Sequence, residues 1–381
     1  MTAKSSSSPL SGLWQPQDHL KHLYYGPGCV QKHLLDVIPS AASKVFIITG
    51  TSIATKTPLI QQLEALLGDH HAGTFSGIKQ HGQVAEVDQA TEIVAANPSI
   101  DTILSVGGGS PIDSAKTISY RMSEKRGKFL THLSIPTTLS AAETTAAGGY
   151  TKADGVKTGF AAPGMGISAI FYDAEYARHT PKKLWLATGM RAVDHAVESY
   201  YHPCAIEMPW KALSHWALAT LFECLPKAHE SHPGDQDVIT RLQLAAFASV
   251  GFHGKNFKGG MGLSHSLGHA LGSPYGIPHG ETSCITLGQV VKFKAKNSPE
   301  DARQIARLLS ATGGTPTADN YREALEVGDR ILGLVDRLGL RQSLTERGIS
   351  RDEIPRIVQR VGGGLTEETY GGVVALVEGF F

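Results

Sequence analysis

The sequence predicts a two-part fold, in which an α/β domain is followed by an all-α domain. In the first part, short β-branched segments alternate with segments that have helical hydrophobic spacing. After about Tyr176, long amphipathic segments replace the short ones. The 381 residues, 41% of them hydrophobic, are enough to build two domain cores. We therefore predict an α/β domain over residues 21–176 and a helical domain over residues 177–381.

The first part contains two strand-and-helix units. Val45–Thr49 is a β-branched segment typical of a strand buried on both faces, and Thr57–Leu67 has the spacing of a helix. In the second unit, a helix over Ala85–Asn97 precedes a strand over Thr102–Val106, and a further helix opens over Asp113–Tyr120. This alternation predicts a parallel sheet with right-handed crossover connections.

The second part is predicted to be entirely helical. Its apolar residues recur at helical spacing in segments that are too long for strands. The predicted helices cover Leu184–Tyr201, Trp210–Ala228, Val238–Phe252, Ser298–Leu309 and Tyr321–Leu338.

Composition and charge narrow the possible partners. Lysine plus arginine and aspartate plus glutamate number 35 each, so no net field attracts nucleic acid or an anionic membrane. No segment approaches the roughly 20 apolar residues that a membrane span needs. A small-molecule partner is therefore favoured over nucleic acid or membrane.

The four cysteines lack the spacing of a zinc site or a disulfide framework, which fits a reducing, cytoplasmic location. They are Cys29, Cys204, Cys224 and Cys284.

The N-terminal segment is serine-rich and has no apolar run behind a basic end, unlike a secretory signal. We expect residues 1–20 to form a flexible tail.

A glycine-rich turn joins the strand over Thr102–Val106 to the helix that follows. The turn is formed by Gly107, Gly108, Gly109 and Ser110. Glycines let the backbone approach a ligand closely, and free N–H groups at a helix start attract anions. Ser110 is predicted to be the N-cap, with Pro111 at the first helical position and Asp113 completing a capping box. A tight turn that binds nothing is the alternative interpretation.

Two further segments favour phosphate binding at this turn. Thr137 and Thr138 end another short strand with two hydroxyl groups, and Lys157 supplies a cation beside Thr158. Either segment taken alone also fits an ordinary turn cap. Together they predict a bound cofactor whose phosphates lie at the glycine-rich turn.

Histidines stand out in three segments of the helical part. Arg191 and His195 share one helix face by their i, i+4 spacing, and His265 and His269 repeat that spacing. His279, between Pro278 and Gly280, is predicted to lie in a loop. Imidazoles on two helices and a loop can converge on one metal or one substrate. Each is also compatible with an ordinary core or surface histidine.

Four motifs together resemble the iron-containing alcohol dehydrogenase superfamily. They are the glycine-rich turn, Ile135-Pro136-Thr137-Thr138, Gly189-Met190 with His195, and Pro278-His279-Gly280, in the family's order and approximate spacing. The resemblance implies a dehydroquinate synthase-like fold, an NAD(H)- or NADP(H)-dependent oxidoreductase, and a cleft between the domains that holds nicotinamide and substrate. It also implies a homodimer.

One position departs from the metal-dependent members of that family. Their ion is held by one aspartate and three histidines; the histidine positions match His195, His265 and His279, but the aspartate position is Arg191. A guanidinium has no lone pair to donate to a metal. Asp194 points about 100° around the helix from His195, which makes it a poor replacement. We therefore predict no catalytic metal, as in the maleylacetate reductase branch, which also lacks the aspartate.

Roles follow for several of these residues. Arg191 is predicted to anchor a carboxylate or enolate oxygen, together with His195, His265 or His279, and His269 is the first choice as general acid. A structural salt bridge from Arg191 to Asp194 or Glu198 is the alternative.

The end of the first strand bears on the choice of nicotinamide cofactor. Gly50 occupies a position where many relatives carry an aspartate, and Thr51 and Ser52 follow with hydroxyl donors. Without that aspartate a 2′-phosphate is not repelled, so we predict that NADPH is accepted.

The sequence leaves three other functions open. One is a metal-dependent alcohol dehydrogenase or aldehyde reductase. Another is a lyase or cyclase that uses the same scaffold without net redox turnover. The last is a dinucleotide-binding protein with no catalysis. The main prediction is a metal-independent reductase of an unsaturated or oxo acid.

Overall fold

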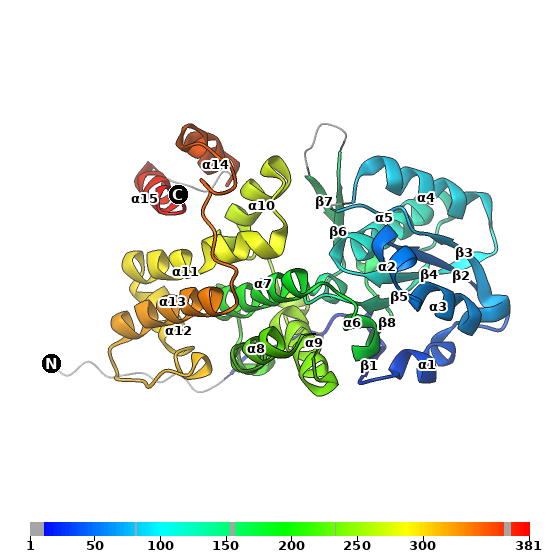
Figure 1. Ribbon diagram of the computed structural model, residues 1–381, viewed down its shortest axis with the longest axis horizontal. Helices are drawn as coiled ribbons and strands as arrows, with labels where there is room; N and C mark the ends of the chain where they lie inside the picture. The colour runs from blue at the N-terminus through cyan, green and yellow to red at the C-terminus, as the bar shows by residue number, and fades with distance from the viewer. Residues whose placement is uncertain (1–10, 81, 153–156, 233, 362–366) are drawn as a thin grey trace.

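The computed structural model describes residues 11–80, 82–152, 157–232, 234–361 and 367–381. It has an α/β half and a helical half, as the sequence predicts, and these lie at opposite ends of the long axis (Figure 1). The half with the sheet comes first in the chain, and the described residues after Tyr172 form no strand.

The sheet has six parallel strands in the order β1-β8-β5-β4-β2-β3. Their bounds are β1 His22–Tyr25, β2 Lys44–Thr49, β3 His71–Phe75, β4 Ile100–Gly107, β5 Thr131–Pro136 and β8 Ala169–Tyr172. The predicted strands over 45–49 and 102–106 correspond to β2 and β4. The parallel register confirms the predicted parallel sheet.

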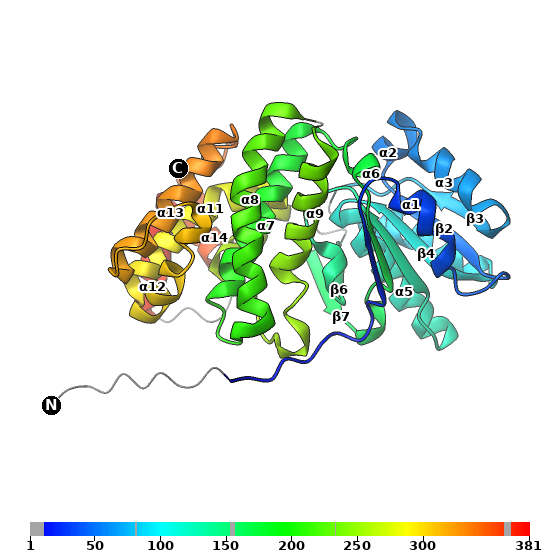
Figure 2. The same ribbon diagram turned by 90° about the horizontal axis from the view of Figure 1, so that it is seen from below.

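Helices cover both faces of this sheet because side chains along β2 alternate between two apolar cores. Val45 and Ile47 pack with α1 (Cys29–His33), α2 (Thr51–Lys56) and α3 (Leu59–Leu67). Phe46 and Ile48 pack on the other side with α4 (Val84–Ala96) and α5 (Gly109–Arg126). Figure 2 shows α1 and α3 on one side of the sheet and α5 on the other.

A two-stranded antiparallel hairpin, β6 (Ala147–Thr151) and β7 (Lys157–Ala161), lies against α5. The fully buried Lys116 of α5 holds it, because its Nζ donates to the carbonyl oxygens of Ala142 and Ala147, each at 2.6 Å. The sequence analysis did not predict this hairpin.

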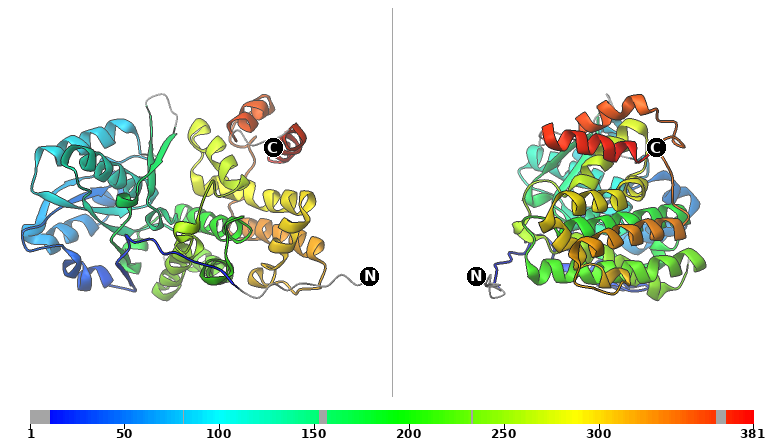
Figure 3. Two further views of the ribbon diagram at one scale, coloured as in Figure 1. Left: turned by 180° about the vertical axis from the view of Figure 1, so that it is seen from behind. Right: turned by 90° about the vertical axis from the view of Figure 1, so that its left-hand side faces the viewer.

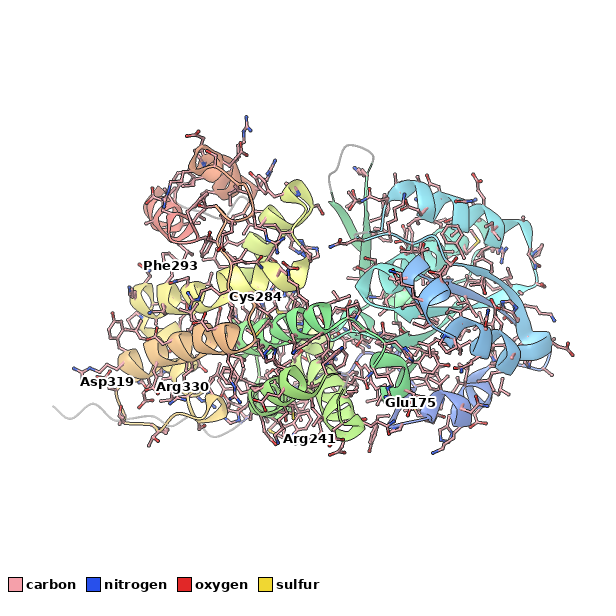
Figure 4. All side chains as sticks on the ribbon, viewed as in Figure 1. Glu175, Arg241, Cys284, Phe293, Asp319 and Arg330 are labelled. Carbon is pink, nitrogen blue, oxygen red and sulfur yellow. The ribbon has the colours of Figure 1, made fainter. Side chains whose placement is uncertain are left out.

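The helical half is built around α7 (Lys182–Tyr200), whose residues from Trp185 to Tyr200 are all buried. It contacts α8, α9 and α11, and Figures 2 and 3 show these helices packed side by side. Figure 4 places Cys284 of α11 inside this bundle, whereas Arg241 and Asp319 lie at its edge. The other helices are α6 Ala174–Ala177, α8 Ala212–Ser231, α9 Gln236–Val250, α10 Leu263–Tyr275, α11 His279–Asn297, α12 Pro299–Ala306, α13 Asn320–Arg337, α14 Ile354–Arg360 and α15 Glu367–Glu378.

In the described ranges, no helix is both long enough and apolar enough to cross a membrane.

The N-terminal segment runs along the helical half to the sheet edge (Figure 2). Trp14 donates its indole N–H to the carbonyl of Phe252 at 2.9 Å, and the backbone N–H of Gln15 donates to Oδ1 of Asn256 at 3.0 Å. Of the predicted tail, residues 1–10 lie outside the described residues. Residues 11–20 are tied to the helical half by these hydrogen bonds.

Two local predictions were wrong. Helix α5 begins at Gly109 with Gly108 as its N-cap, so Ser110 is not the cap; the N–H of Ile112 bonds to the carbonyl of Gly108 and closes the first turn earlier. His279 is not in a loop but is the first residue of α11. The extended Pro278 (φ −56°, ψ 138°) is the N-cap there, and its carbonyl accepts from the N–H of Glu281.

Candidate active site

A cleft of about 880 Å³ lies where the two halves meet. One side is formed by the segments that follow β2, β4 and β5, and the other by α7, α10 and the start of α11. A volume of this size is within the range of about 300–1,000 Å³ that is usual for small-molecule and cofactor sites.

The strand order explains why the cleft opens at this edge of the sheet. From β2 the chain continues to β3 on one side and then crosses to β4 on the other side. Thr49 at the end of β2 pairs with Val106 of β4, so Gly50 and Gly107 follow adjacent strand ends. Ligands of parallel α/β sheets bind at such a switch point, outside the carboxyl ends of the strands.

The glycine-rich turn is shaped for close approach of a ligand. Gly107 has φ 141°, which side-chain-bearing residues rarely adopt. A Cβ on Gly108 would lie 2.9 Å from Cγ2 of Thr138. No side chain of the N-cap closes the start of α5, so backbone N–H groups of its first turn are presented to the cleft. An anionic group such as a pyrophosphate fits this position.

The cleft brings together most of the residues predicted for the cofactor. Gly107 is not among the residues that line the cleft, and the side chain of Lys157 lies outside the described part of β7. The predicted cofactor residues that line the cleft are Gly50, Thr51, Ser52, Gly108, Gly109, Ser110, Asp113, Thr137 and Thr138.

The helical side of the cleft carries four of the five predicted catalytic side chains. Arg191 and His195 line it from α7, His269 from α10 and His279 from α11. The rings of His269 and His279 lie 5.3 Å apart, centroid to centroid. His265 does not line the cleft; its ring lies behind His195 at a centroid distance of 4.9 Å.

Glycines let these three helices approach one another. A Cβ on Gly280 would lie 2.6 Å from the carbonyl carbon and oxygen of Ala187 on α7, so the start of α11 rests on the α7 backbone. On α10, a Cβ at Gly268 would lie 3.0 Å from Oγ1 of Thr282, and one at Gly272 would lie 3.1 Å from the His279 ring. Larger residues would force the helices apart and move the histidines.

The guanidinium of Arg191 contacts the buried carboxylate of Asp194. Its Nη1 lies 3.5 Å from Oδ2 of Asp194 and 3.2 Å from Oγ of Ser283. Oδ2 of Asp194 also accepts from the hydroxyls of Ser264 (2.9 Å) and Ser283 (2.6 Å). Among the described residues, no acceptor binds Nε or Nη2 of Arg191. The guanidinium is thus anchored at one nitrogen while it lines the cleft.

Glu198, one turn further along α7, accepts four hydrogen bonds. Its Oε1 accepts from the hydroxyl of Tyr201 (3.1 Å) and the backbone N–H of Ser264 (2.8 Å). Its Oε2 accepts from the backbone N–H of His265 (3.1 Å) and from Nδ1 of the same residue (2.8 Å). Both carboxylate oxygens are fully used by the protein.

Burial and charge shift the pKa values of the two neighbouring histidines, His195 and His265, in opposite directions. Burial first, then the charges of His265 and Arg191, lower the pKa of His195 well below its usual value, so its ring is neutral. Burial and Arg191 also oppose the charged form of His265. The charge of Asp194 and the hydrogen bonds that the His265 ring donates to Asp194 and Glu198 outweigh them and raise its pKa.

The carboxylate of Asp194 is the charged partner in this arrangement. Burial would raise its pKa, but His265, Arg191 and the hydrogen bond from Ser283 together lower it. The buried cluster therefore places the carboxyl groups of Asp194 and Glu198 beside the guanidinium of Arg191 and the imidazole of His265.

One group of side chains has ligand-type atoms close enough to surround a metal ion. Atoms of Asp194, Glu198 and His265 lie within 4.8 Å of one another. However, Glu198 already accepts four hydrogen bonds, and Nδ1 of His265 is one of the donors. Glu198 and Nδ1 of His265 are therefore occupied, whereas Oδ1 of Asp194 and Nε2 of His265 have no hydrogen-bond partner among the described residues.

The set expected from the metal-dependent relatives does not assemble either. His195, His265 and His279 form no group of that closeness in the ranges that the structure describes. The guanidinium of Arg191 adds a fixed positive charge beside Asp194. This charge disfavours a divalent cation beside Asp194, whereas the glycine-rich turn fits the phosphates of a dinucleotide.

Sequence reasoning missed the hydroxyls that join the two halves. Thr180 donates to the carbonyl of Thr137 at 2.7 Å, and Thr188 accepts from the N–H of Leu139 at 3.1 Å. Both threonines line the cleft. No local pattern marks them, because their partners lie more than 40 residues away in the chain.

Comparisons with known proteins agree with this architecture. Residues 21–174 match the family model described as iron-containing alcohol dehydrogenase, and residues 185–367 match that of the Fe-containing alcohol dehydrogenase family, C-terminal. The chain is 31% identical to maleylacetate reductase 2 of Cupriavidus pinatubonensis over 289 residues, 76% of each chain. It is 28% identical to the maleylacetate reductase of Sphingobium indicum over 340 residues, covering 87% of this chain and 86% of the relative.

A solved structure has the same fold. The maleylacetate reductase from Rhizobium sp. strain MTP-10005 superimposes with a TM-score of 0.80 at 23% identity, covering 98% of both chains.

Proposed function

The chain belongs to the iron-containing alcohol dehydrogenase family and is an NAD(P)-dependent oxidoreductase, and we propose that it reduces an unsaturated or oxo acid without a catalytic metal. The observation that carries this proposal is the guanidinium of Arg191, which lines the cleft beside His195 and is balanced from behind by Asp194. Its charge lies in the region where metal-dependent relatives would hold their ion. The maleylacetate reductase relatives favour an acid as substrate.

Each part of the cleft then has a separate task. The glycine-rich turn and Thr138 hold the cofactor, which supplies a hydride when it is bound in its reduced form. Such a hydride would add to an electron-poor carbon of the substrate, and negative charge would develop on the carbonyl oxygen that is attached to this carbon or conjugated with it. Preorganised donors at that oxygen are worth roughly 3–4 kcal/mol of barrier each.

Arg191 is the donor we assign to that oxygen or to the substrate carboxylate. Its Nη1 is held by Asp194 and Ser283, which fixes the plane of the guanidinium and leaves Nε and Nη2 to form a two-point contact with the substrate. The neutral ring of His195 is a second donor beside it.

His269 is the residue we assign as general acid. It lines the cleft from α10, beside His279, and a histidine has an ordinary pKa of about 6.5, close to neutrality. A proton passes from its imidazolium to the substrate, so that hydride and proton together complete a two-electron reduction. His279 is placed to orient the same ring.

We also propose that NADPH is preferred over NADH. Gly50 lines the cleft with Thr51, and no carboxylate follows β2 to repel a 2′-phosphate. Lys79 lines the same end of the cleft, with a side chain that is 75% exposed and paired to Glu86 at 3.0 Å. We expect Lys79→Ala to lower the ratio of kcat/KM for NADPH to that for NADH, and a large preference of the unchanged enzyme for NADH would refute this assignment.

The decisive experiment combines metal content with substrate range. Elemental analysis before and after chelator treatment is paired with NADPH oxidation across keto acids, enoic acids and aldehydes. We expect no stoichiometric metal, no effect of the chelator, and turnover of acids in preference to aldehydes. Activity that follows the metal content would indicate a metal-dependent alcohol dehydrogenase, and product formed without cofactor oxidation would indicate a lyase or cyclase.

Substitution of Arg191 tests the anchoring role directly. Arg191→Lys keeps the charge and loses the planar two-point contact, so we expect kcat/KM for the acid to fall by about 100-fold while the Kd for NADPH stays within twofold. Unchanged turnover in this variant would show that Arg191 does not anchor the substrate and serves only as the salt-bridge partner of Asp194.

A further inference from the structure

We propose that Glu198 is a positioning residue, which caps helix α10 from helix α7 and thereby sets where His269 stands in the cleft. This inference rests on the proposed function insofar as His269 is the general acid. Glu198 does not line the cleft, so its effect on the reaction must pass through α10.

The contacts identify the carboxylate as the cap of α10. The helix begins at Leu263, and its N-cap, Gly262, has no side chain to bond the first N–H groups. Glu198 fills this place from another helix, since it accepts from the N–H groups of Ser264 and His265 at 2.8 and 3.1 Å. A negative charge at this end also complements the helix dipole.

Gly262 makes this close contact possible. A Cβ at this position would lie 2.5 Å from Cδ and from Oε1 of Glu198. Its φ of 165° is extended backbone open to any residue, so the need for glycine arises from space alone. The carboxylate and the N-terminus of α10 are thus in direct van der Waals contact.

The position of His269 follows from that of His265. The two residues are one helical turn apart on the same face of α10, about 6 Å along its axis. Glu198 holds both the backbone N–H and Nδ1 of His265, so it fixes the rotation of the helix as well as its height. If the first turn moves, His269 moves with it.

The cofactor side of the cleft is independent of this contact. It is tied to α7 and to the segment before it through Thr188 and Thr180, not through α10. Loss of the Glu198 contact should therefore reduce kcat and spare cofactor affinity.

Glu198→Gln is the most informative variant, because the amide has the same shape as the carboxylate but only one oxygen that accepts hydrogen bonds. Its NH₂ group would face two of the four donors. In the full-length protein we expect kcat to fall by about 10- to 100-fold, the Kd for NADPH to stay within twofold, and the amides of Ser264 and His265 to exchange hydrogen faster.

Gly262→Ala tests the same contact and leaves the carboxylate in place. We expect the same pattern, and we expect the double variant with Glu198→Gln to lose little more than either single variant. If Glu198→Gln does not fold, Gly262→Ala alone decides.

Glu323→Gln is the matched control. Glu323 is also buried and also bonds a backbone N–H, that of Thr317, but it lies on α13 and does not line the cleft. This variant should keep the kcat of the unchanged protein.

The outcomes separate this inference from the proposed function. If no acid is reduced, faster exchange at Ser264 and His265 still supports the capping role, while the proposed reaction fails. Unchanged exchange at both amides, or an unchanged kcat with faster exchange, would overturn the positioning role. An equal loss of kcat in Glu323→Gln would overturn it as well.

Discussion

The two sides of the cleft present different chemical groups. The sheet side presents backbone and hydroxyl groups, with Gly108, Thr137 and Thr138 as its main elements. The helical side presents charged and imidazole groups that are held by a buried network behind them, with Asp194 and Glu198 fully buried. A dinucleotide needs only a turn of the right shape, whereas a reacting oxygen needs charges fixed in place. Substitutions on the sheet side should therefore lower cofactor affinity, whereas substitutions on the helical side should lower kcat.

The largest effect is expected where α11 rests on α7. In Gly280→Ala, the new Cβ would meet the Ala187 carbonyl at 2.6 Å, so the helices must separate. We expect a loss of about 1–3 kcal/mol in the free energy of unfolding and a fall of about 100-fold in kcat. Chemical denaturation and steady-state kinetics measure both. Weaker NADPH binding with normal kcat would show that the two sides are not separable in this way.

Acid should weaken both halves, because each contains a buried histidine whose pKa is lowered to about 3. Burial first, then Lys116, lowers the pKa of His132 in the sheet to about 3, and burial with His202 and His265 lowers that of His253 to about 3. The unfolded chain takes up these protons below about pH 6.5, so stability is present above that pH and is lost as pH falls toward 3. At pH 5 each histidine should cost about 2 kcal/mol.

Denaturation curves between pH 7 and pH 4 measure this loss. His132→Gln should make the sheet half less sensitive to acid, with no change in the slope contributed by His253. An unchanged pH dependence would mean that His132 titrates normally.

A substitution in the glycine-rich turn on the sheet side should change the affinity for NADPH. In Gly108→Ala, the new Cβ meets Cγ2 of Thr138 at 2.9 Å, while a φ of −85° imposes no backbone strain. We expect the Kd for NADPH to rise about 10-fold, or about 1.4 kcal/mol, with kcat at saturating cofactor nearly unchanged. Calorimetry measures the affinity. Adding Thr138→Ser removes the clashing methyl and should restore part of it.

The smallest effect is expected at the junction of the two halves. Thr188→Val leaves the N–H of Leu139 without the acceptor that it has at 3.1 Å. We expect a loss of about 1 kcal/mol in the free energy of unfolding. Thr188→Ser keeps the oxygen and should behave like the unchanged protein, and equal losses in the two variants would assign the effect to the missing methyl group instead.

The sheet side was largely predictable because its signals are local. A β-branched segment, a glycine run and a helical segment follow one another between Thr102 and Tyr120 and need no distant partner. Even there the helix start was misplaced by two residues, because Gly109 rather than Pro111 is the first helical residue and Gly108 rather than Ser110 is the N-cap. Cap positions depend on backbone angles, which composition alone does not determine.

On the helical side, the sequence identified which residues matter but not how they pair. Arg191 and His195 share a face by spacing alone, and both line the cleft. That His265 lies behind them, bonded to Glu198, depends on the crossing of α7 and α10. The helix start at His279 likewise depends on the packing of Gly280 against Ala187.

The sequence by itself determined the change from an α/β part to a helical part, the glycine-rich turn and the arginine in place of the family aspartate. Each of these depends on residue type and on spacing within a few turns of chain. Only the tertiary structure decided that Oδ2 of Asp194 and both carboxylate oxygens of Glu198 accept hydrogen bonds from α10 and α11, while Arg191 lines the cleft. The reason is physical: the cost of burying a charge depends on which partners surround it, and helix packing brings those partners from up to 89 residues away.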